Sequence, residues 1–329
     1  MNNSPILVTG SPRSGTTWVG NILKQSSNVY YIHEPFDPNG ITRNNMLINI
    51  WYKYLRPNKK HQIFYILIDS LIQGKYQFQD TFHFRNALPI YDFRNPNGIN
   101  TGKFNYNNFP WRLKQLINSV LNQIRSLNTN YRFRGLIKDP IAIFSAEWLY
   151  NNFNTQNLIL IRHPAAFVSS LKRLNWHFDF NNFLKQNELM EDHLLKYKNQ
   201  MELTSGNITE EASLLWVCIH SVIKYYQENY PSWVFKRHED ISRNPLKEFE
   251  NIFQLLDLEF NKIIKEKIID LTSSKNPSEV TKHGKIHQLK RDSLANIYNW
   301  KNRLSKNEID QIKRITKATA DHFYSDDEW

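Results

Sequence analysis

A glycine-rich loop near the start of the chain carries the residue types that bind anions. The loop, residues 10–18 with the sequence GSPRSGTTW, follows a short apolar segment that is predicted to be a buried strand. We expect a helix from about Thr16, and the first N–H groups of a helix, together with its dipole, attract a negatively charged group. Arg13 adds a cation within the loop itself. The loop is therefore predicted to bind an anion such as a phosphate or a sulfate.

The spacing within this loop is that of the phosphate-binding P-loop, G-x-x-x-x-G-K-[ST]. Gly10 and Gly15 take the glycine positions and Thr17 takes the Ser/Thr position, but Thr16 stands where the motif has lysine. A nucleoside triphosphatase uses that lysine to reach the β- and γ-phosphates. The loop thus keeps the backbone cradle for an anion and lacks the cation that suits a triphosphate. A P-loop kinase or triphosphatase is the alternative enzyme, although no predicted strand ends in the Asp of a Walker-B motif.

Charged residues also stand at the ends of the other predicted strands. Glu34 follows the second strand, Lys138 and Arg162 end the third and the fourth, and Arg237 follows the fifth. Ligands of parallel α/β sheets bind beyond the carboxyl ends of the strands. The concentration of cations at these ends predicts a binding site for an anion, with a carboxylate beside it.

Apolar runs that alternate with amphipathic segments must position these residues. This alternation is typical of parallel βαβ units, and we expect an α/β fold in which a parallel β-sheet is flanked by helices. The predicted strands are residues 4–9, 29–33, 133–138, 157–162 and 233–236. The first predicted helix begins at about residue 16, and residues 43–74 are predicted to form two helical pieces with a break near residue 57. Further helices are predicted at 111–127, 141–153, 165–174, 209–228, 246–256 and 305–323. We expect one domain over residues 1–329, with insertions at about 40–130 and 175–208 and a basic segment at 275–303.

Three stretches resemble sulfotransferases that use 3′-phosphoadenosine 5′-phosphosulfate (PAPS). Residues 12–18 are similar to the loop that holds the 5′-phosphosulfate in that family. Arg162, in the string IRHP, with Ser170 eight residues later, resembles the motif that holds the 3′-phosphate. Residues 233–258, where ED and NP precede an apolar helix, resemble a strand–helix element found late in these proteins. The resemblance covers residues 6–258 and implies a P-loop-like sulfotransferase architecture.

The resemblance also implies which residues contact the donor. The donor-binding residues would be Arg13, Ser14, Gly15, Thr16, Thr17, Trp18, Arg162, Ser170 and Arg291. The family closes the pocket around the 3′-phosphate with a basic segment that contains Arg-Lys-Gly. Residues 282–284 read KHG here instead, so either Lys282 or Arg291 could serve. Independently of the family, arginine is the natural partner of a phosphate dianion, because its guanidinium binds two oxygens at once.

Transfer of a sulfuryl group to an alcohol requires removal of the hydroxyl proton. Carbohydrate-type members of the family use an acidic residue, often before proline, and Glu34 followed by Pro35 is similar to that arrangement. His33 is the competitor for the role of base, because aryl-type members use a histidine. Pro35 is expected to keep Glu34 extended, and adjacent side chains on a strand point to opposite faces, so only one of the two can face the acceptor. By the same resemblance, Lys138 and Arg13 would stabilise charge on the transferred group.

The composition limits the partners and cofactors. The chain has 329 residues, a net charge of +11 at pH 7 and a single cysteine, Cys218, which excludes an intrachain disulfide and a cysteine-based zinc or iron–sulfur site. No cluster of His, Asp and Glu has metal-ligand spacing, and no metal is expected. The basic charge also permits a nucleic-acid-binding protein, which is the non-enzyme alternative. No DNA- or RNA-binding motif is present, and we expect no nucleic-acid partner.

The sequence indicates location and acceptor in outline. The longest apolar stretch, residues 63–72, is about half a membrane span, and the N-terminal residues lack the apolar segment of a signal peptide. A cytoplasmic protein without a transmembrane segment is therefore expected. Residues 75–110, which are rich in aromatic residues and asparagine, and residues 176–206 are candidate acceptor surfaces. Aromatic rings stack on sugars, which favours a carbohydrate or glycolipid acceptor over a small phenol. The oligomeric state is left open.

Overall fold

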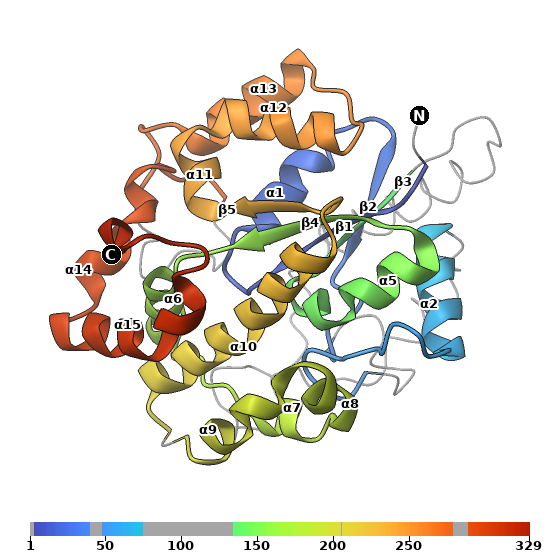
Figure 1. Cartoon of the computed structure of the whole chain (residues 1–329). Helices are drawn as coiled ribbons and strands as arrows, with labels where there is room; N and C mark the ends of the chain where they lie inside the picture. The colour runs from blue at the N-terminus through green and yellow to red at the C-terminus, as the bar shows by residue number, and fades with distance from the viewer. Residues whose placement is uncertain (1–2, 40–47, 75–133, 205, 279–288) are drawn as a thin grey trace, which may run out of the picture.

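The described part of the chain is organised around one five-stranded parallel sheet (Figure 1). The computed structural model describes residues 3–39, 48–74, 134–204, 206–278 and 289–329. The strands are β1 (Ile6–Gly10), β2 (Val29–His33), β3 (Arg134–Lys138), β4 (Gln156–Ile161) and β5 (Val234–Arg237), in the order β2-β3-β1-β4-β5. β2 has the predicted bounds and the other four strands differ by one or two residues. The predicted parallel α/β fold is confirmed.

The register of the sheet brings the ends of four strands to one edge. His33 of β2 and Val8 of β1 both pair with Lys138 at the end of β3, and Gly10 at the end of β1 pairs with Leu160 of β4. Gly10 has φ 143°, and a Cβ atom at this position would lie 2.2 Å from the Leu160 carbonyl oxygen. Only glycine allows β1 and β4 to approach this closely where the loop after β1 begins.

Helices cover both faces of the sheet and separate two hydrophobic cores (Figure 1). Ile6 and Val8 of β1 point to the face covered by α1 (Thr16–Leu23), α12 (Pro245–Leu255) and α13 (Lys262–Thr272). Leu7 points to the opposite face, covered by α2 (Gln62–Ile72), α5 (Ala146–Phe153), α6 (Pro164–Leu174), α10 (Ile208–Asn229) and α15 (Lys306–Ala320). Consecutive strand residues face opposite sides, which explains this division. β1 and β4 are neighbours in the sheet, but α1, which follows β1, and α6, which follows β4, pack on opposite faces. In parallel α/β sheets, ligands bind at the carboxyl ends of two such strands.

Shorter helices complete the described part of the chain. They are α7 (Asn181–Leu184), α8 (Asn187–Leu189) and α9 (Lys198–Glu202) within the predicted insertion, α11 (His238–Arg243) after β5, and α14 (Asn299–Arg303) before α15. The predicted helices at 165–174, 209–228 and 246–256 are α6, α10 and α12, each with ends within one residue of the prediction. The predicted helix at 141–153 begins instead with a 3-10 helix, Pro140–Ser145, ahead of α5.

One predicted helix is wrong. Residues 48–61 form no helix, although the first helical piece of 43–74 is predicted to extend into them. The Trp51 backbone N–H donates to Asn182 Oδ1 at 3.0 Å, and the Tyr54 N–H donates to Gln186 Oε1 at 2.8 Å. Side chains of a distant segment therefore satisfy backbone groups that a helix would have paired locally. The predicted features within 75–133, including the helix at 111–127, and the basic run at 282–285 lie outside the described residues.

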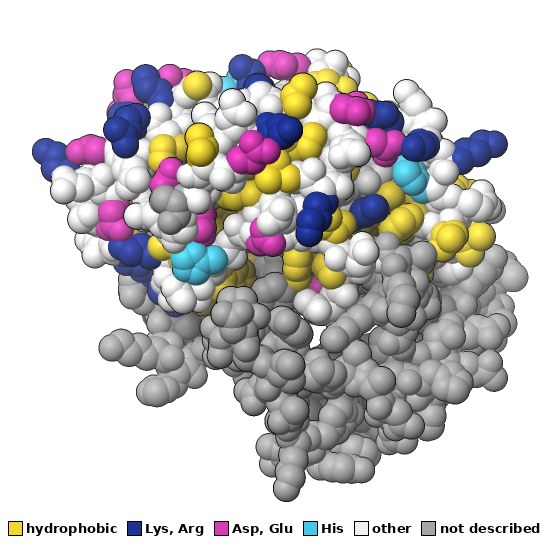
Figure 2. Space-filling model, turned by 90° about the horizontal axis from the view of Figure 1, so that it is seen from below, with side chains coloured by type: hydrophobic (Ala, Val, Ile, Leu, Met, Phe, Trp, Pro, Cys, Tyr) yellow, Lys and Arg dark blue, Asp and Glu magenta, His cyan; other side chains and the backbone are white. Residues whose placement is uncertain are grey.

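Basic and acidic side chains are interspersed on the described part of the face seen from below in Figure 2. Among the described residues, no helix is both long enough and apolar enough to cross a membrane. The cytoplasmic location stays a prediction.

Candidate functional site

The loop after β1 forms a concave backbone surface at the start of α1. Arg13 (φ 65°) and Gly15 (φ 96°) both have left-handed backbone conformations, and the Ser14 N–H donates to the Ser11 carbonyl at 3.2 Å. A Cβ atom on Gly15 would lie 2.8 Å from His238 Nδ1, so a larger residue does not fit. When successive residues alternate between right-handed and left-handed conformations, their backbone N–H groups point toward one position, and such a concave surface binds anions.

Three of the predicted donor-binding residues meet beside this loop. Arg13 Nε donates to Ser170 Oγ of α6 at 3.1 Å, and Arg162 Nη1 donates to the Arg13 carbonyl oxygen. Ser170 is 4% exposed, and it lies two turns into the helix that begins just after Arg162. The structure thus brings together side chains from the ends of β1 and β4.

The positive charges at this place are concentrated and buried. Burial, together with the nearby guanidinium groups of Arg162, Arg291 and Arg173, lowers the pKa of Arg13 to about 9. Burial also lowers the pKa of Arg162. Guanidinium groups that destabilise one another in this way gain free energy when an anion binds between them. Arg291 was predicted to be a donor ligand, and its charge acts on Arg13 here.

Several polar atoms around the loop are buried without a hydrogen-bond partner among the described residues. They are Ser11 Oγ, Ser14 Oγ, Trp18 Nε1 and Arg162 Nε. Buried polar groups in native proteins nearly always have a partner, and unpaired ones require an explanation such as a missing ligand. A phosphorylated ligand with many acceptor oxygens fits this set of donors.

Glu34 and Lys138 form an ion pair at the ends of β2 and β3. The Lys138 side chain is fully buried and its Nζ donates to Glu34 Oε1, while the Glu34 side chain is 25% exposed. The Glu34 N–H also donates to the Lys138 carbonyl at 2.9 Å. The stem of Lys138 packs against Gly20 of α1, where a Cβ atom would lie 2.9 Å from Lys138 Cγ. The carboxylate is thus held in one direction by a lysine that cannot move freely.

The expected backbone of Glu34 is wrong. Its φ is 45°, which is left-handed and not extended as predicted from Pro35. The strand ends at His33, so the side chains do not alternate at this point, and His33 Nδ1 lies 4.0 Å from Glu34 Oε2. The argument that only one of the two can face the acceptor therefore fails. Both side chains stand at the same corner of the sheet.

Asp139 supports the turn that carries Glu34. Its carboxylate accepts from the Phe36 N–H at 2.7 Å and from the Ile141 N–H at 3.0 Å, so it joins the turn after β2 to the 3-10 helix after β3. Burial and the nearby charge of Glu34 together raise the pKa of Asp139 to about 8. The bond between Asp139 and Phe36 joins residues that are 103 positions apart, so no local sequence pattern indicates it.

One of the strand-end cations does not belong to the anion site. Arg237 donates from Nε to Asp240 Oδ2 at 2.8 Å and from Nη1 to Glu328 Oε2 at 2.9 Å. Its charge is balanced by these carboxylates, so its role is structural. The expectation that the end of the fifth strand adds a cation to the site is therefore wrong. Among the described residues, no group of three or more His, Cys, Asp and Glu side chains could hold a metal ion.

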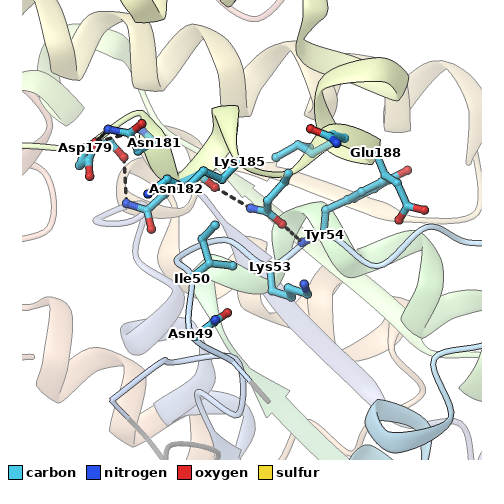
Figure 3. A pocket seen from close by; sticks show the side chains of 12 residues that line it. Asn49, Ile50, Lys53, Tyr54, Asp179, Asn181, Asn182, Lys185 and Glu188 are labelled. Carbon is cyan, nitrogen blue, oxygen red and sulfur yellow. Dashed lines mark hydrogen bonds between the residues drawn. The ribbon is translucent and has the colours of Figure 1, made fainter. Parts of the chain in front are cut away.

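A polar cavity of about 500 Å³ lies between residues 49–54 and the α7–α8 segment (Figure 3). Its lining includes Asn49, Ile50 and Lys53 on one side and Asn182, Lys185 and Glu188 on the other. The side-chain amide of Gln186 fixes the two sides together, since Oε1 accepts from the Tyr54 N–H at 2.8 Å and Nε2 donates to the Tyr52 carbonyl at 3.2 Å. α7 and α8 lie within residues 176–206, one of the predicted acceptor surfaces, whereas residues 49–54 were not predicted to contribute to such a surface.

Comparisons with known proteins place the chain in a family. The sequence model described as the sulfotransferase family matches residues 5–211. No curated protein matches the chain. Among solved structures, the sulfotransferase domain from the curacin biosynthetic pathway is 15% identical, with 95% of this chain and 97% of that chain covered and a TM-score of 0.47. The sulfotransferase domain of the Synechococcus PCC 7002 olefin synthase is 16% identical, with 98% and 96% covered and a TM-score of 0.45. Sulfotransferase STF9 from Mycobacterium avium is 12% identical, with 98% and 77% covered and a TM-score of 0.43.

The family match extends over more than half of the chain. It includes the loop after β1, the Glu34–Lys138 pair and the residues from Arg162 to Ser170. The chain belongs to the sulfotransferase family and is a sulfotransferase enzyme.

Proposed function

We propose that the protein transfers the sulfuryl group of PAPS to a hydroxyl group of an acceptor. The observation that carries this proposal is the convergence of Arg13, Arg162 and Ser170 beside the start of α1, with 3.1 Å between Arg13 Nε and Ser170 Oγ. PAPS has anionic groups at both its 3′ and 5′ positions, so it needs two neighbouring sites for anions. The loop after β1 would provide one of these sites, and Arg162 with Ser170 of α6 would provide the other.

The proposed donor site assigns one phosphate to each side of this cluster. Arg162 and Ser170 would bind the 3′-phosphate, and the loop from Arg13 to Trp18 would hold the 5′-phosphosulfate through the backbone N–H groups of Ser14, Gly15, Thr16 and Thr17. Arg291 would close the pocket from the C-terminal side, in place of the Arg-Lys-Gly segment of the family. The unpaired Trp18 Nε1 and Arg162 Nε atoms support this assignment, because each is a donor without a partner in the described part.

Glu34 would act as the general base. As the acceptor oxygen forms its bond to sulfur, the bond between sulfur and the 5′-phosphate oxygen breaks, and the hydroxyl proton passes to Glu34. Lys138 holds one carboxylate oxygen through the ion pair, which leaves the other oxygen for the acceptor. Arg13 and Lys138 would stabilise the negative charge that develops on the transferred group and the leaving phosphate. Positioning and electrostatic stabilisation supply most of the catalysis in related group transfers.

We propose a carbohydrate or glycolipid as the acceptor. The cavity in Figure 3 supports this proposal, because amide and charged side chains form hydrogen bonds with hydroxyl groups. Its two walls come later in the chain than the two halves of the site: residues 49–54 come after the turn that carries Glu34, and α7 comes after the helix that carries Ser170. We also propose that residues 1–329 form one sulfotransferase domain, since helices from both ends of the chain cover the same sheet.

Incubation of the protein with radiolabelled PAPS and a panel of acceptors tests the proposal. The panel should contain neutral oligosaccharides, acidic oligosaccharides, glycolipids and simple phenols. We expect label on at least one saccharide hydroxyl and none on the phenols. Label on phenols alone would overturn the acceptor assignment, and magnesium-dependent hydrolysis of ATP without any sulfuryl transfer would overturn the proposal as a whole.

A further inference from the structure

A buried carboxylate connects the residue after Arg162 to the C-terminal segment. Glu239 of α11 is 3% exposed and uses both of its oxygens. Oε1 accepts from the His163 backbone N–H at 3.0 Å, and Oε2 accepts from the Tyr324 hydroxyl at 3.0 Å. The C-terminal segment lies beside α6, α11 and α14 in Figure 1. Glu239 therefore links this segment to the main chain next to the arginine that we assign to the donor.

The His163 side chain makes a second connection to the same segment. Its ring stacks on Trp300, with the centroids 5.1 Å apart, and it contacts Tyr324 and Trp329 edge-on at 4.9 and 4.6 Å. Its Nδ1 accepts a hydrogen bond from the Ala165 N–H at 3.2 Å, which caps the start of α6. Burial lowers the pKa of His163 to about 3, so the ring is neutral at pH 7 and Nδ1 can act as an acceptor. The helix that carries Ser170 is thus also held by these aromatic rings.

The main chain of Arg162 is held from the other side by α10. Its carbonyl accepts a hydrogen bond from Trp216 Nε1 at 2.8 Å, and its guanidinium donates to the carbonyl of Arg13. Fixed partners therefore lie on both sides of the residue. Such a support reduces the loss of side-chain freedom when a phosphate binds, and this loss otherwise weakens binding.

The C-terminal segment is itself anchored on β5. Arg237 at the end of that strand donates from Nη1 to the Phe323 carbonyl at 2.9 Å and to Glu328 Oε2 at 2.9 Å. These two residues stand on either side of Tyr324 in the chain. The Tyr324 hydroxyl is therefore presented to Glu239 by a segment that is attached to the sheet.

We propose that Tyr324 is a positioning residue for the donor site. Through Glu239 it holds the main chain after Arg162, and so directs the guanidinium toward the 3′-phosphate. The inference rests on the proposed function, because it takes Arg162 as the ligand of that phosphate. Tyr324 acts through other residues and does not touch the donor, so its effect should be confined to the 3′-phosphate.

Calorimetric titration of the Tyr324→Phe variant with two nucleotides tests this inference. Loss of one positioned hydrogen bond should raise the Kd for adenosine 3′,5′-bisphosphate about tenfold, while the Kd for adenosine 5′-phosphate stays within about twofold of the wild type. The control is Tyr226→Phe, which removes an equally buried hydroxyl that donates to the Ile143 carbonyl at 3.0 Å. The control should leave the ratio of the two dissociation constants unchanged. A merely structural role of Tyr324 would weaken both nucleotides equally and would contradict the inference.

A second variant keeps the test decisive if Tyr324→Phe does not fold. Glu239→Met removes the acceptors of both the His163 N–H and the Tyr324 hydroxyl, so it should lose the preference for the bisphosphate as Tyr324→Phe does. A folded Glu239→Met variant that keeps the full preference would overturn the inference. Titration of the wild type distinguishes the assignment of Arg162 to the 3′-phosphate from the positioning role of Tyr324. If the wild type does not prefer the bisphosphate, the assignment of Arg162 is wrong, and the positioning role is wrong with it. A wild-type preference that Tyr324→Phe leaves intact overturns the positioning role alone.

Discussion

Arg13 Nε donates a hydrogen bond to Ser170 Oγ at 3.1 Å, although 157 positions separate the two residues in the chain. Arg13 belongs to the loop after β1 and Ser170 to α6 after β4, so this bond joins the ends of two neighbouring strands. A phosphate oxygen is a stronger acceptor for a guanidinium group than a hydroxyl is. An anion that enters the cluster would therefore replace the Ser170 oxygen as the partner of Arg13.

The Ser170→Ala variant should bind adenosine 3′,5′-bisphosphate about fivefold more weakly, because one hydrogen bond contributes roughly 0.5–1.5 kcal/mol. Binding of adenosine 5′-phosphate should not change. Ser213→Ala is the matched control, since the Ser213 hydroxyl is also buried in a helix, where it donates to the Thr209 carbonyl at 2.6 Å. Titration calorimetry measures both variants, and equal losses for the two nucleotides would exclude Ser170 as a ligand of the 3′-phosphate.

The Glu34→Gln variant should lose turnover by about 100-fold or more, since a general base contributes about this much. Its affinity for the bisphosphate should stay the same, because Glu34 lies on the acceptor side of the proposed site. The His33→Asn variant should be only mildly affected. Initial rates at saturating PAPS measure these effects. A dead His33 variant beside an active Glu34 variant would assign the base to histidine and favour an aryl-type acceptor.

The Lys138→Met variant should also lose turnover by about 100-fold or more, as removal of one preorganised donor does in other enzymes. Lys138 and Glu34 form one ion pair, so the double variant with Glu34→Gln should lose less than the product of the two single effects. Steady-state rates of the four proteins complete this cycle. Fully multiplicative losses would show that the two residues act independently.

The stability of the fold should fall in acid, partly because of His163. Burial, together with the charges of Lys301 and Arg162, lowers the pKa of His163 to about 3 from the ordinary value of 6.5. The unfolded chain therefore binds a proton below pH 6.5 that the folded protein does not, and stability is lost as pH falls from 6.5 toward 3. Each such group contributes a slope of about 1.4 kcal/mol per pH unit.

His163→Asn tests this contribution, because asparagine can still cap α6 but does not titrate. Denaturant unfolding at pH 7, 6 and 5 should show that the stability difference between wild type and variant shrinks as the pH falls. A constant difference over this range would contradict the lowered pKa.

The strands and the main site residues could be predicted because local patterns determine them. β2 is a run of β-branched and aromatic residues that ends at His33 as predicted. Lys138 and Arg162 could be located because parallel strands end at one edge of a sheet. An Asp followed by Pro is typical of a helix start, and the Asp139 side chain, just before Pro140, accepts from the Ile141 N–H.

The remaining features depend on contacts between residues that are distant in the chain. The left-handed backbone of Glu34 occurs beside bonds to Lys138, which is 104 residues away. Residues 48–61 are not helical where Gln186, from the far insertion, binds their backbone. The bond between Tyr324 and Glu239 also spans 85 residues. None of these contacts leaves a periodic signal in the sequence, so sequence patterns could not predict them.

The central claim is that Arg162 binds the 3′-phosphate of the donor, and titration calorimetry with adenosine 3′,5′-bisphosphate and adenosine 5′-phosphate tests it most directly. We predict that the wild type binds the bisphosphate far more tightly, and that Arg162→Met loses about 1.5–3 kcal/mol of that binding free energy. Arg314→Met, which removes the same charge from an exposed position on α15, should bind as the wild type does. Equal affinity of the wild type for the two nucleotides, or an Arg162→Met variant that still prefers the bisphosphate to the full extent, would contradict the account.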